Sequence, residues 1–312
     1  MNSTKLKMFR EEAFLANRVL PRIILPKPLP PKTPHPKQRL ESAKRMTIVF
    51  GILQSDGIVF AADTEETGEF LKFSTPKLYS HSRTNGEQLV IGGAGSSFSV
   101  ETVQQRLGKS FIADSASFEE IAGTIIKQFY EEQVVTNADQ QDFQLIFGGS
   151  FRTTEDTFSH RLWISERGCL RDAGNIAAIG IGSGTARILL KQYAFHAVRP
   201  ITELLAAHVL RLVKEQVPYC GKENTVWQLS GLNVLQMTSA QLQKAEELSR
   251  RYDDLHRNMF SAFFAQDTSL PYIYSKFSAL RSDYAKLLDD VTAHYASEKV
   301  INEQIRNNPE EF

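Results

Sequence analysis

The sequence predicts an α+β protein, a four-layer αββα sandwich in which two antiparallel sheets are covered by pairs of helices. Between residues 47 and 236, runs rich in β-branched residues alternate with longer helical stretches. Their order is strands, two helices, strands, two helices and a closing strand pair, which suits two packed sheets with helices outside. A charged, helix-favouring segment at 237–312 then predicts a C-terminal helical extension.

The first elements of this domain are two strands joined by a tight turn. Residues 47–53 and 57–63 are rich in β-branched residues, and Asp56-Gly57 between them is a hairpin signal. A further strand is predicted at 89–93. Helices are predicted next at 97–109 and 118–133, because apolar residues recur at helical spacing in the second. These are Ile121, Ile125, Ile126 and Phe129.

The second half of the domain repeats this order. Its predicted elements are strands at 143–151, 160–165 and 176–180, helices at 185–197 and 201–216, and a last strand pair within 225–237. Beyond it, 246–255 favours a helix, the pattern breaks at 268–271, and 274–303 resumes it with an apolar stripe. The stripe is Leu280, Tyr284, Leu287 and Leu288. We therefore expect a helical hairpin at 237–312.

Residues 1–46 differ from the rest in composition. Residues 1–45 hold seven of the twelve prolines, and eleven Lys or Arg against three Glu. Proline at this density cannot supply the backbone donors of a helix or sheet, so we expect an extended, basic arm. Three interpretations stay open: Met46 is the true start, the arm is a removable propeptide, or it is a retained tail. The first two place the mature N-terminus at Thr47.

The overall composition excludes several classes of function. Lys plus Arg and Asp plus Glu both number 36, so net charge gives no attraction to nucleic acid or membrane. No apolar run approaches the roughly 18 residues of a membrane helix. Two cysteines, Cys169 and Cys220, do not suggest a disulfide framework, so we expect a cytoplasmic protein. The seven histidines have no metal-ligand spacing, and neither a metal nor an organic cofactor is expected.

Four residues between positions 47 and 93 stand out. Thr47 opens the first strand, and Asp63 closes the second sixteen residues later. Lys77 follows Pro76, and Gly93 lies in the glycine-rich segment 91–96. In combination these resemble the opening of proteasome β-type subunits, which are N-terminal-nucleophile (Ntn) hydrolases. The resemblance covers about residues 47–236 and implies the Ntn-hydrolase fold. It includes a Lys-bearing strand at 76–78 and a glycine-rich turn at 178–184.

The resemblance also implies threonine-type amide hydrolysis. A Thr hydroxyl is a poor nucleophile until a base takes its proton, and a terminal amine with a pKa near about 7.7–8.0 can be that base. Thr47 would supply both groups once it begins the chain. Lys77 would keep the amine neutral by like-charge repulsion, and Asp63 would hold Lys77. The amide of Gly93 would donate to the oxyanion.

Some positions depart from the family pattern. Ile181 stands where the glycine-rich turn usually has a Ser, with Ser183 close by. In the segment 217–221, Cys220 replaces a Ser that supports the terminal amine, and the usual Asp is missing. Met46 replaces the Gly that precedes the nucleophile in self-processing precursors.

The four matching residues have ordinary structural interpretations too. Thr47 suits a strand through its β propensity, and Asp63 suits a turn. Lys77 can be a solvated charge, and Gly93 part of a tight turn. Their joint occurrence at the family's spacing favours the catalytic interpretation.

We therefore expect a threonine-type hydrolase that cleaves peptide bonds in peptides or unfolded proteins. Two alternatives remain: a non-catalytic structural or assembly subunit whose Thr47 stays behind residues 1–46, and a small-molecule amidase. By resemblance, the protein would form a ring-like homo-oligomer, with an ATPase as a possible partner.

Two predicted helices carry more apolar residues than one core face needs. The residues are Phe98, Val100, Val103 and Leu107 in the first, and Ile188, Leu189, Tyr193 and Phe195 in the second. In a monomer some of them would form an exposed patch that drives association, unless the C-terminal helices cover it.

Overall fold

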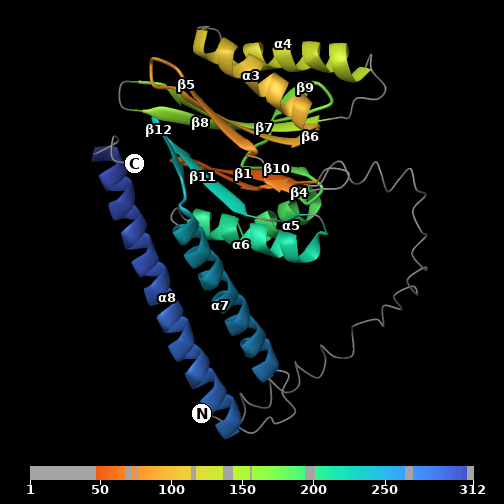
Figure 1. The fold of residues 1–312 in the computed structure, drawn as a ribbon. Helices are drawn as coiled ribbons and strands as arrows, with labels where there is room; N and C mark the ends of the chain where they lie inside the picture. The colour runs from red at the N-terminus through yellow and green to blue at the C-terminus, as the bar shows by residue number, and fades with distance from the viewer. Residues whose placement is uncertain are drawn as a thin grey trace, which may run out of the picture. The chain divides into compact units, whose positions relative to one another are not determined.

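Two five-stranded sheets and the helices that cover them form the predicted sandwich (Figure 1). The computed structural model describes residues 47–67, 72–74, 76–113, 117–135, 143–154, 157–193, 201–218, 220–221, 223–263 and 270–307. The predicted arm at 1–46, the predicted helix beyond residue 193 and the start of the predicted break at 268–271 lie outside these ranges.

The first sheet is antiparallel, with the strand order β10-β1-β2-β11-β12. β1 and β2 form the predicted hairpin. A side chain at Gly57 would overlap the Leu229 carbonyl oxygen, so the close approach of β11 requires glycine in this turn. The strands are β1 (Ile48–Gln54), β2 (Gly57–Asp63), β10 (Ile176–Gly180), β11 (Asn224–Ser230) and β12 (Asn233–Gln236).

The second sheet is also antiparallel, in the order β5-β6-β7-β8-β9. Its edge strand β9 is not predicted from the sequence, because it is short and largely exposed. Of β5, only Leu78 lies in the strand that the family resemblance implies at 76–78. Its strands are β5 (Leu78–Ser82), β6 (Gln88–Gly95), β7 (Phe143–Arg152), β8 (Phe158–Glu166) and β9 (Cys169–Asp172). A separate pair, β3 (Glu65–Thr67) and β4 (Lys72–Ser74), lies between β2 and β5 in the chain.

Helices α3 (Ser97–Ala113) and α4 (Phe118–Phe129) cover the outer face of the second sheet (Figure 1). The hydroxyl of Ser117 caps α4 by accepting a hydrogen bond from the Glu120 N–H. The predicted helix at 118–133 changes type near its end, where the π-helical segment η1 (Tyr130–Val135) begins. The layer beneath these helices is rich in aromatic rings, including those of α4 and β7.

Helices α5 (Ser183–Tyr193) and α6 (Ile201–Gln216) cover the first sheet in the same way. Between the two sheets lies a third apolar cluster, to which Val49, Phe60 and Ile146 contribute. Three apolar clusters therefore fill the spaces between the four layers, which are a helix pair, two sheets and a second helix pair. The predicted αββα class is confirmed.

The C-terminal helices α7 (Ser239–Phe263) and α8 (Leu270–Asn307) are longer than predicted. A capping box begins α7: Thr238 Oγ1 accepts from the Gln241 N–H, and Gln241 Oε1 accepts from the Thr238 N–H. Leu242 and Ala245 belong to the core under α6. By packing, the start of α7 is part of the sandwich, whereas α8 packs mainly on α7.

This packing makes α7 a contributor to the stability of the whole domain. Leu242→Ala should lower the free energy of unfolding by about 2–5 kcal/mol, because it leaves a cavity in the core. Leu288 on α8 is 51% exposed, so the matched Leu288→Ala should change it by no more than about 0.5 kcal/mol. Urea unfolding of the full chain measures both. Equal effects would contradict the assignment of α7 to the core.

Candidate active site

The carboxylate of Asp63 is the centre of a buried polar site. Asp63 ends β2 and is 0% exposed. Its Oδ1 accepts hydrogen bonds from Thr47 Oγ1 at 2.8 Å, the Ile48 N–H at 3.1 Å and Lys77 Nζ at 2.8 Å. Its Oδ2 accepts from the Gly221 N–H at 3.2 Å. Four donors from three separate segments of the chain thus converge on one carboxylate.

Thr47 lies immediately before β1 and is only 5% exposed. In the β1–β10 pairing, its neighbour Ile48 is opposite Gly180. A side chain at Gly180 would overlap the carbonyl oxygen of Thr47, and Gly180 has a φ of +86°. Both facts require glycine there, and together they fix the main chain of Thr47 against the end of β10.

Lys77 joins the other two residues from the second sheet. It lies directly before β5, and its side chain is 9% exposed. Its ammonium donates hydrogen bonds both to Asp63 Oδ1 and to Thr47 Oγ1. The structure therefore brings together three of the four residues selected from the sequence.

Gly93 is on β6, next to the strand that follows Lys77. Its N–H donates to the carbonyl oxygen of Lys77 at 3.1 Å. A side chain at this position would overlap Val100 of α3. Close packing of that helix therefore gives a structural reason for glycine, and its role as oxyanion donor stays a prediction.

Two of the three positions that depart from the family pattern lie around the same end of the first sheet, and the third, Met46, lies outside the described residues. Ile181 follows β10 and is 42% exposed, while Ser183 begins α5. Cys220 is buried in the core under α6. A side chain at Gly182 would contact Cys220 Sγ, so the glycine-rich turn and the segment before β11 pack together.

Sequence reasoning missed two residues of the site. Gly221, whose N–H donates to Asp63, directly follows Cys220, a position at which the sequence departs from the family pattern, and this neighbourhood is a usable signal. Gln144, at the start of β7, accepts a hydrogen bond from the Gly180 N–H at 3.1 Å. Nothing in the sequence marks Gln144, because the contact joins strands of different sheets.

No protein-family model matches the sequence, and no curated protein matches it. Solved structures do. Anbu (ancestral beta-subunit) from Yersinia bercovieri superposes with a TM-score of 0.61 at 14% identity. An Anbu (Gly-1) mutant from Hyphomicrobium sp. strain MC1 gives 0.59 at 16%, and the Anbu complex from Pseudomonas aeruginosa gives 0.56 at 14%. Each match covers 72% of this chain and 100% of the other.

This chain has the proteasome-like Ntn-hydrolase fold. At such low identity the likeness shows the fold alone. Within the described residues, no cluster of three or more His, Cys, Asp or Glu side chains is suited to a metal ion. No helix in the described part is long and apolar enough to span a membrane.

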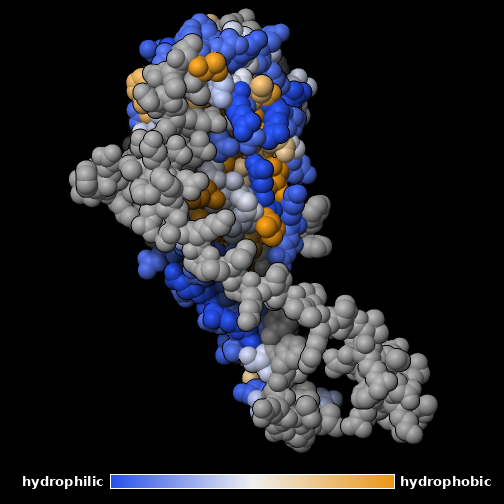
Figure 2. Space-filling view, turned by 90° about the vertical axis from the view of Figure 1, so that its right-hand side faces the viewer, coloured by the Kyte–Doolittle hydropathy of each residue, from blue (hydrophilic) through white to orange (hydrophobic). Residues whose placement is uncertain are grey.

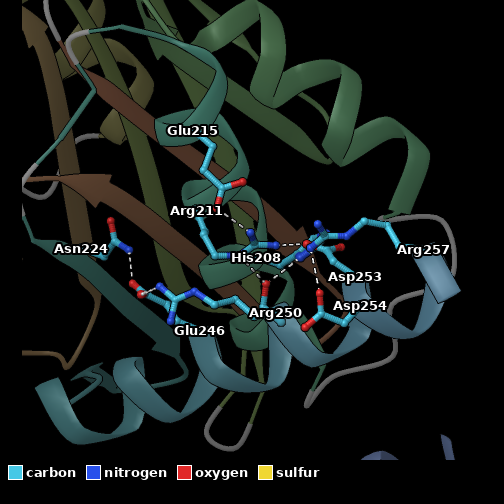
Figure 3. Close-up of polar contacts among 10 residues, drawn as sticks. His208, Arg211, Glu215, Asn224, Glu246, Arg250, Asp253, Asp254 and Arg257 are labelled. Carbon is cyan, nitrogen blue, oxygen red and sulfur yellow. Dashed lines mark hydrogen bonds and ion pairs between the residues drawn. The ribbon is translucent and has the colours of Figure 1, made fainter.

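A second polar cluster joins α6 to α7 (Figure 3). Arg211 donates from Nε to Ser249 Oγ at 2.9 Å and from Nη1 to Glu215 at 2.7 Å, and its Nη2 pairs with Asp253. His208 Nδ1 lies 2.8 Å from the same Ser249 oxygen. Ser, His and Asp are residue types of a hydrolytic triad, but Ser249 is buried and bonded to Arg211. We interpret the cluster as the polar contact that holds α7 on α6.

The cluster contains a histidine that resists protonation. Burial lowers the pKa of His208 below its ordinary 6.5, and Arg211 and His256 lower it further, while Asp253 and Glu215 raise it. Burial also lowers the pKa of His81 on β5, and a hydrogen bond with Gln104 opposes this shift.

Stability should therefore fall as the solution is acidified. Below the ordinary pKa of 6.5, the unfolded chain takes up protons at His208 that the folded chain does not. The free energy of unfolding then decreases as pH falls. Urea unfolding between about pH 5 and 7 measures how steeply the free energy of unfolding changes with pH. His208→Asn should make this slope smaller, and His81→Asn should do so independently. An unchanged slope in His208→Asn would show that this histidine does not resist protonation.

Proposed function

We propose that the protein is a threonine-type N-terminal-nucleophile hydrolase that cleaves peptide bonds. One observation carries the proposal: Thr47 Oγ1 donates to Asp63 and accepts from Lys77 within a nearly buried cluster. A structural Thr at the start of a strand needs neither partner. A nucleophilic hydroxyl benefits from both, because the ammonium stabilises negative charge developing on Oγ1 and the carboxylate holds the ammonium in place.

The proposed reaction uses a chain that begins at Thr47. The neutral α-amine of Thr47 takes the Oγ1 proton while Oγ1 bonds to the carbonyl carbon of the substrate. The resulting ammonium then gives this proton to the leaving amine as the C–N bond breaks, which leaves an ester on Thr47. Water next loses a proton to the amine and attacks the ester, and Oγ1 regains the proton as the acyl group leaves.

Two parts of the site would stabilise the tetrahedral intermediates. Lys77 faces the reacting oxygen and is held by Asp63. The Gly93 N–H, which donates to the Lys77 carbonyl, would be shared with the oxyanion as a three-centre bond. Hydrogen-bond donors fixed before the reaction stabilise developing charge without reorganisation.

Three observations favour the non-catalytic alternative. Thr47 is only 5% exposed. Cys220 replaces the Ser that supports the terminal amine in the family, and Ile181 stands where the family's glycine-rich turn usually has a Ser. A subunit that keeps residues 1–46 would use Thr47 for packing alone. Intact-mass analysis of the native protein separates the two possibilities, because only a chain beginning at Thr47 can carry the base.

The catalytic proposal predicts a graded loss of activity. Thr47→Ala should abolish peptide hydrolysis, and Lys77→Met should reduce kcat at least about 100-fold. Lys77→Met leaves a buried carboxylate without its cation, which lowers stability. The double variant Lys77→Met/Asp63→Asn should therefore be more stable than Lys77→Met and remain inactive. Lys191 on α5 is exposed, so Lys191→Met is the matched control and should keep full activity.

A chemical test does not depend on the substrate. A peptide epoxyketone should add one mass increment at Thr47, since it reacts with both a hydroxyl and an α-amine on one residue. An adduct on another residue, or unchanged hydrolysis by Thr47→Ala, would overturn the assignment.

We also propose that the protein assembles as a homo-oligomer. Phe98 on α3 and Ile188 on α5 are 61% and 69% exposed, and α7 packs on α6 and β11 without covering them. The other apolar residues of α3 considered from the sequence, Val100, Val103 and Leu107, are buried in the chain's own core. The Pseudomonas aeruginosa Anbu complex forms a helical assembly. On the face drawn in Figure 2, separate apolar patches reach the surface among hydrophilic residues.

Light scattering tests this assembly. The wild-type chain should have a mass well above the 35.2 kDa of one copy, and Ile188→Asp should shift the mass toward that value, because a buried unpaired charge opposes association. Val135 has nearly the same exposure, 68%, and Val135→Asp is the matched control. A wild-type monomer would refute the proposal.

A further inference from the structure

The side chain of Gln144 connects the two sheets at the end that holds the candidate site. Gln144 is on β7 of the second sheet. Its Oε1 accepts from the N–H of Gly180 on β10 of the first sheet, at 3.1 Å. Its Nε2 lies within hydrogen-bond distance of Glu166 Oε1, at 3.4 Å. One amide group therefore uses its acceptor on one sheet and its donor on the other.

On the first sheet, Gly180 is coupled to the proposed nucleophile. It is opposite Ile48 in the β1–β10 pairing, and its Cα faces the carbonyl oxygen of Thr47 so closely that no side chain fits. A shift of Gly180 would therefore move the main chain of Thr47.

On the second sheet, Gln144 is coupled to the proposed oxyanion donor. In the β6–β7 pairing, Gln144 is opposite Ala94, and Leu145 is opposite Gly93. The backbone of Gln144 thus moves with the strand of Gly93, while its side chain holds the strand beside Thr47.

Glu166 anchors the donor end of this contact. It is opposite Gln144 in the β7–β8 pairing. Its carboxylate pairs with Arg171 at 2.7 Å and with Arg187 at 3.7 Å. Arg187 also donates to the Ala178 carbonyl oxygen at 2.7 Å, so Glu166 is linked to β10 through Arg187 as well as through Gln144.

We propose that Gln144 is a positioning residue that sets the spacing between Thr47 and Gly93. This inference rests on the proposed hydrolase function. In that reaction the attacking oxygen and the oxyanion donor act on one carbonyl group, and they come from different sheets. A misplacement of about 1 Å between catalytic groups can cost about 100-fold in rate, so a contact that fixes the two strands acts on kcat.

The first experiment removes the contact. Gln144→Ala in the mature protein should lower kcat of peptide hydrolysis about 10- to 100-fold and change KM less than about twofold. The rate of Thr47 labelling by the epoxyketone should fall in parallel. Gln236→Ala on the exposed end of β12 is the matched control and should change neither. A general loss of structure would also lower the apparent kcat, because less of the enzyme is folded, but it would lower the midpoint of thermal unfolding as well. The positioning role instead lowers kcat in a protein whose unfolding midpoint lies well above the assay temperature.

The second experiment exchanges the two partners. Gln144→Glu can still accept from the Gly180 N–H but places a second carboxylate beside Glu166, so kcat should fall at neutral pH. Adding Glu166→Gln places an amide donor opposite the new carboxylate, so a hydrogen bond between positions 144 and 166 can form again in the reverse direction. The double variant should recover kcat to within about threefold of the wild type.

The outcomes separate this inference from the function on which it rests. If the wild type is not labelled at Thr47, the hydrolase proposal and the role of Gln144 fail together. If the wild type is labelled and Gln144→Ala has the same kcat and labelling rate, only the positioning role is refuted. Failure of the exchanged pair to recover activity, with the single variants impaired, would likewise refute the hydrogen-bond basis of the role.

Discussion

The buried carboxylate of Asp63 is the interaction on which the rest of the site depends. It receives hydrogen bonds from Thr47, Ile48, Lys77 and Gly221. An ionised group in an apolar interior costs several kcal/mol unless it is paired and fully hydrogen bonded. The start of β1, the residue before β5 and the segment before β11 must therefore meet at the end of β2 whenever the sandwich folds with this group charged.

The same constraint explains why the site lies between the sheets. Thr47 and Asp63 come from the first sheet, and Lys77 and Gly93 from the second. The two sheets approach each other closely here, as the overlap of any side chain at Gly92 with Val49 shows. The site has no structure apart from the packing of the two sheets.

Local patterns in the sequence determined most of the helices and strands and pointed to the candidate catalytic residues. The bounds predicted at 57–63, 176–180 and 201–216 agree with β2, β10 and α6. Turn signals and helical or alternating hydrophobic periodicity are properties of short segments, so they can be recognised without knowledge of tertiary contacts. Spacing relative to a known family selected Thr47 and Asp63, whose contact the structure contains.

Only the tertiary structure decided which segments complete the site. The edge strands β5 and β9 have little apolar patterning, since pairing with a neighbouring strand holds them. Gly221 reaches Asp63 across 158 residues of sequence, and Gln144 reaches Gly180 from the opposite sheet. The sequence pointed to Gly93 as an oxyanion donor through its backbone amide. In the structure, the absence of a side chain at Gly93 also makes room for Val100 of α3. Such contacts depend on how the layers pack, which no short segment encodes by itself.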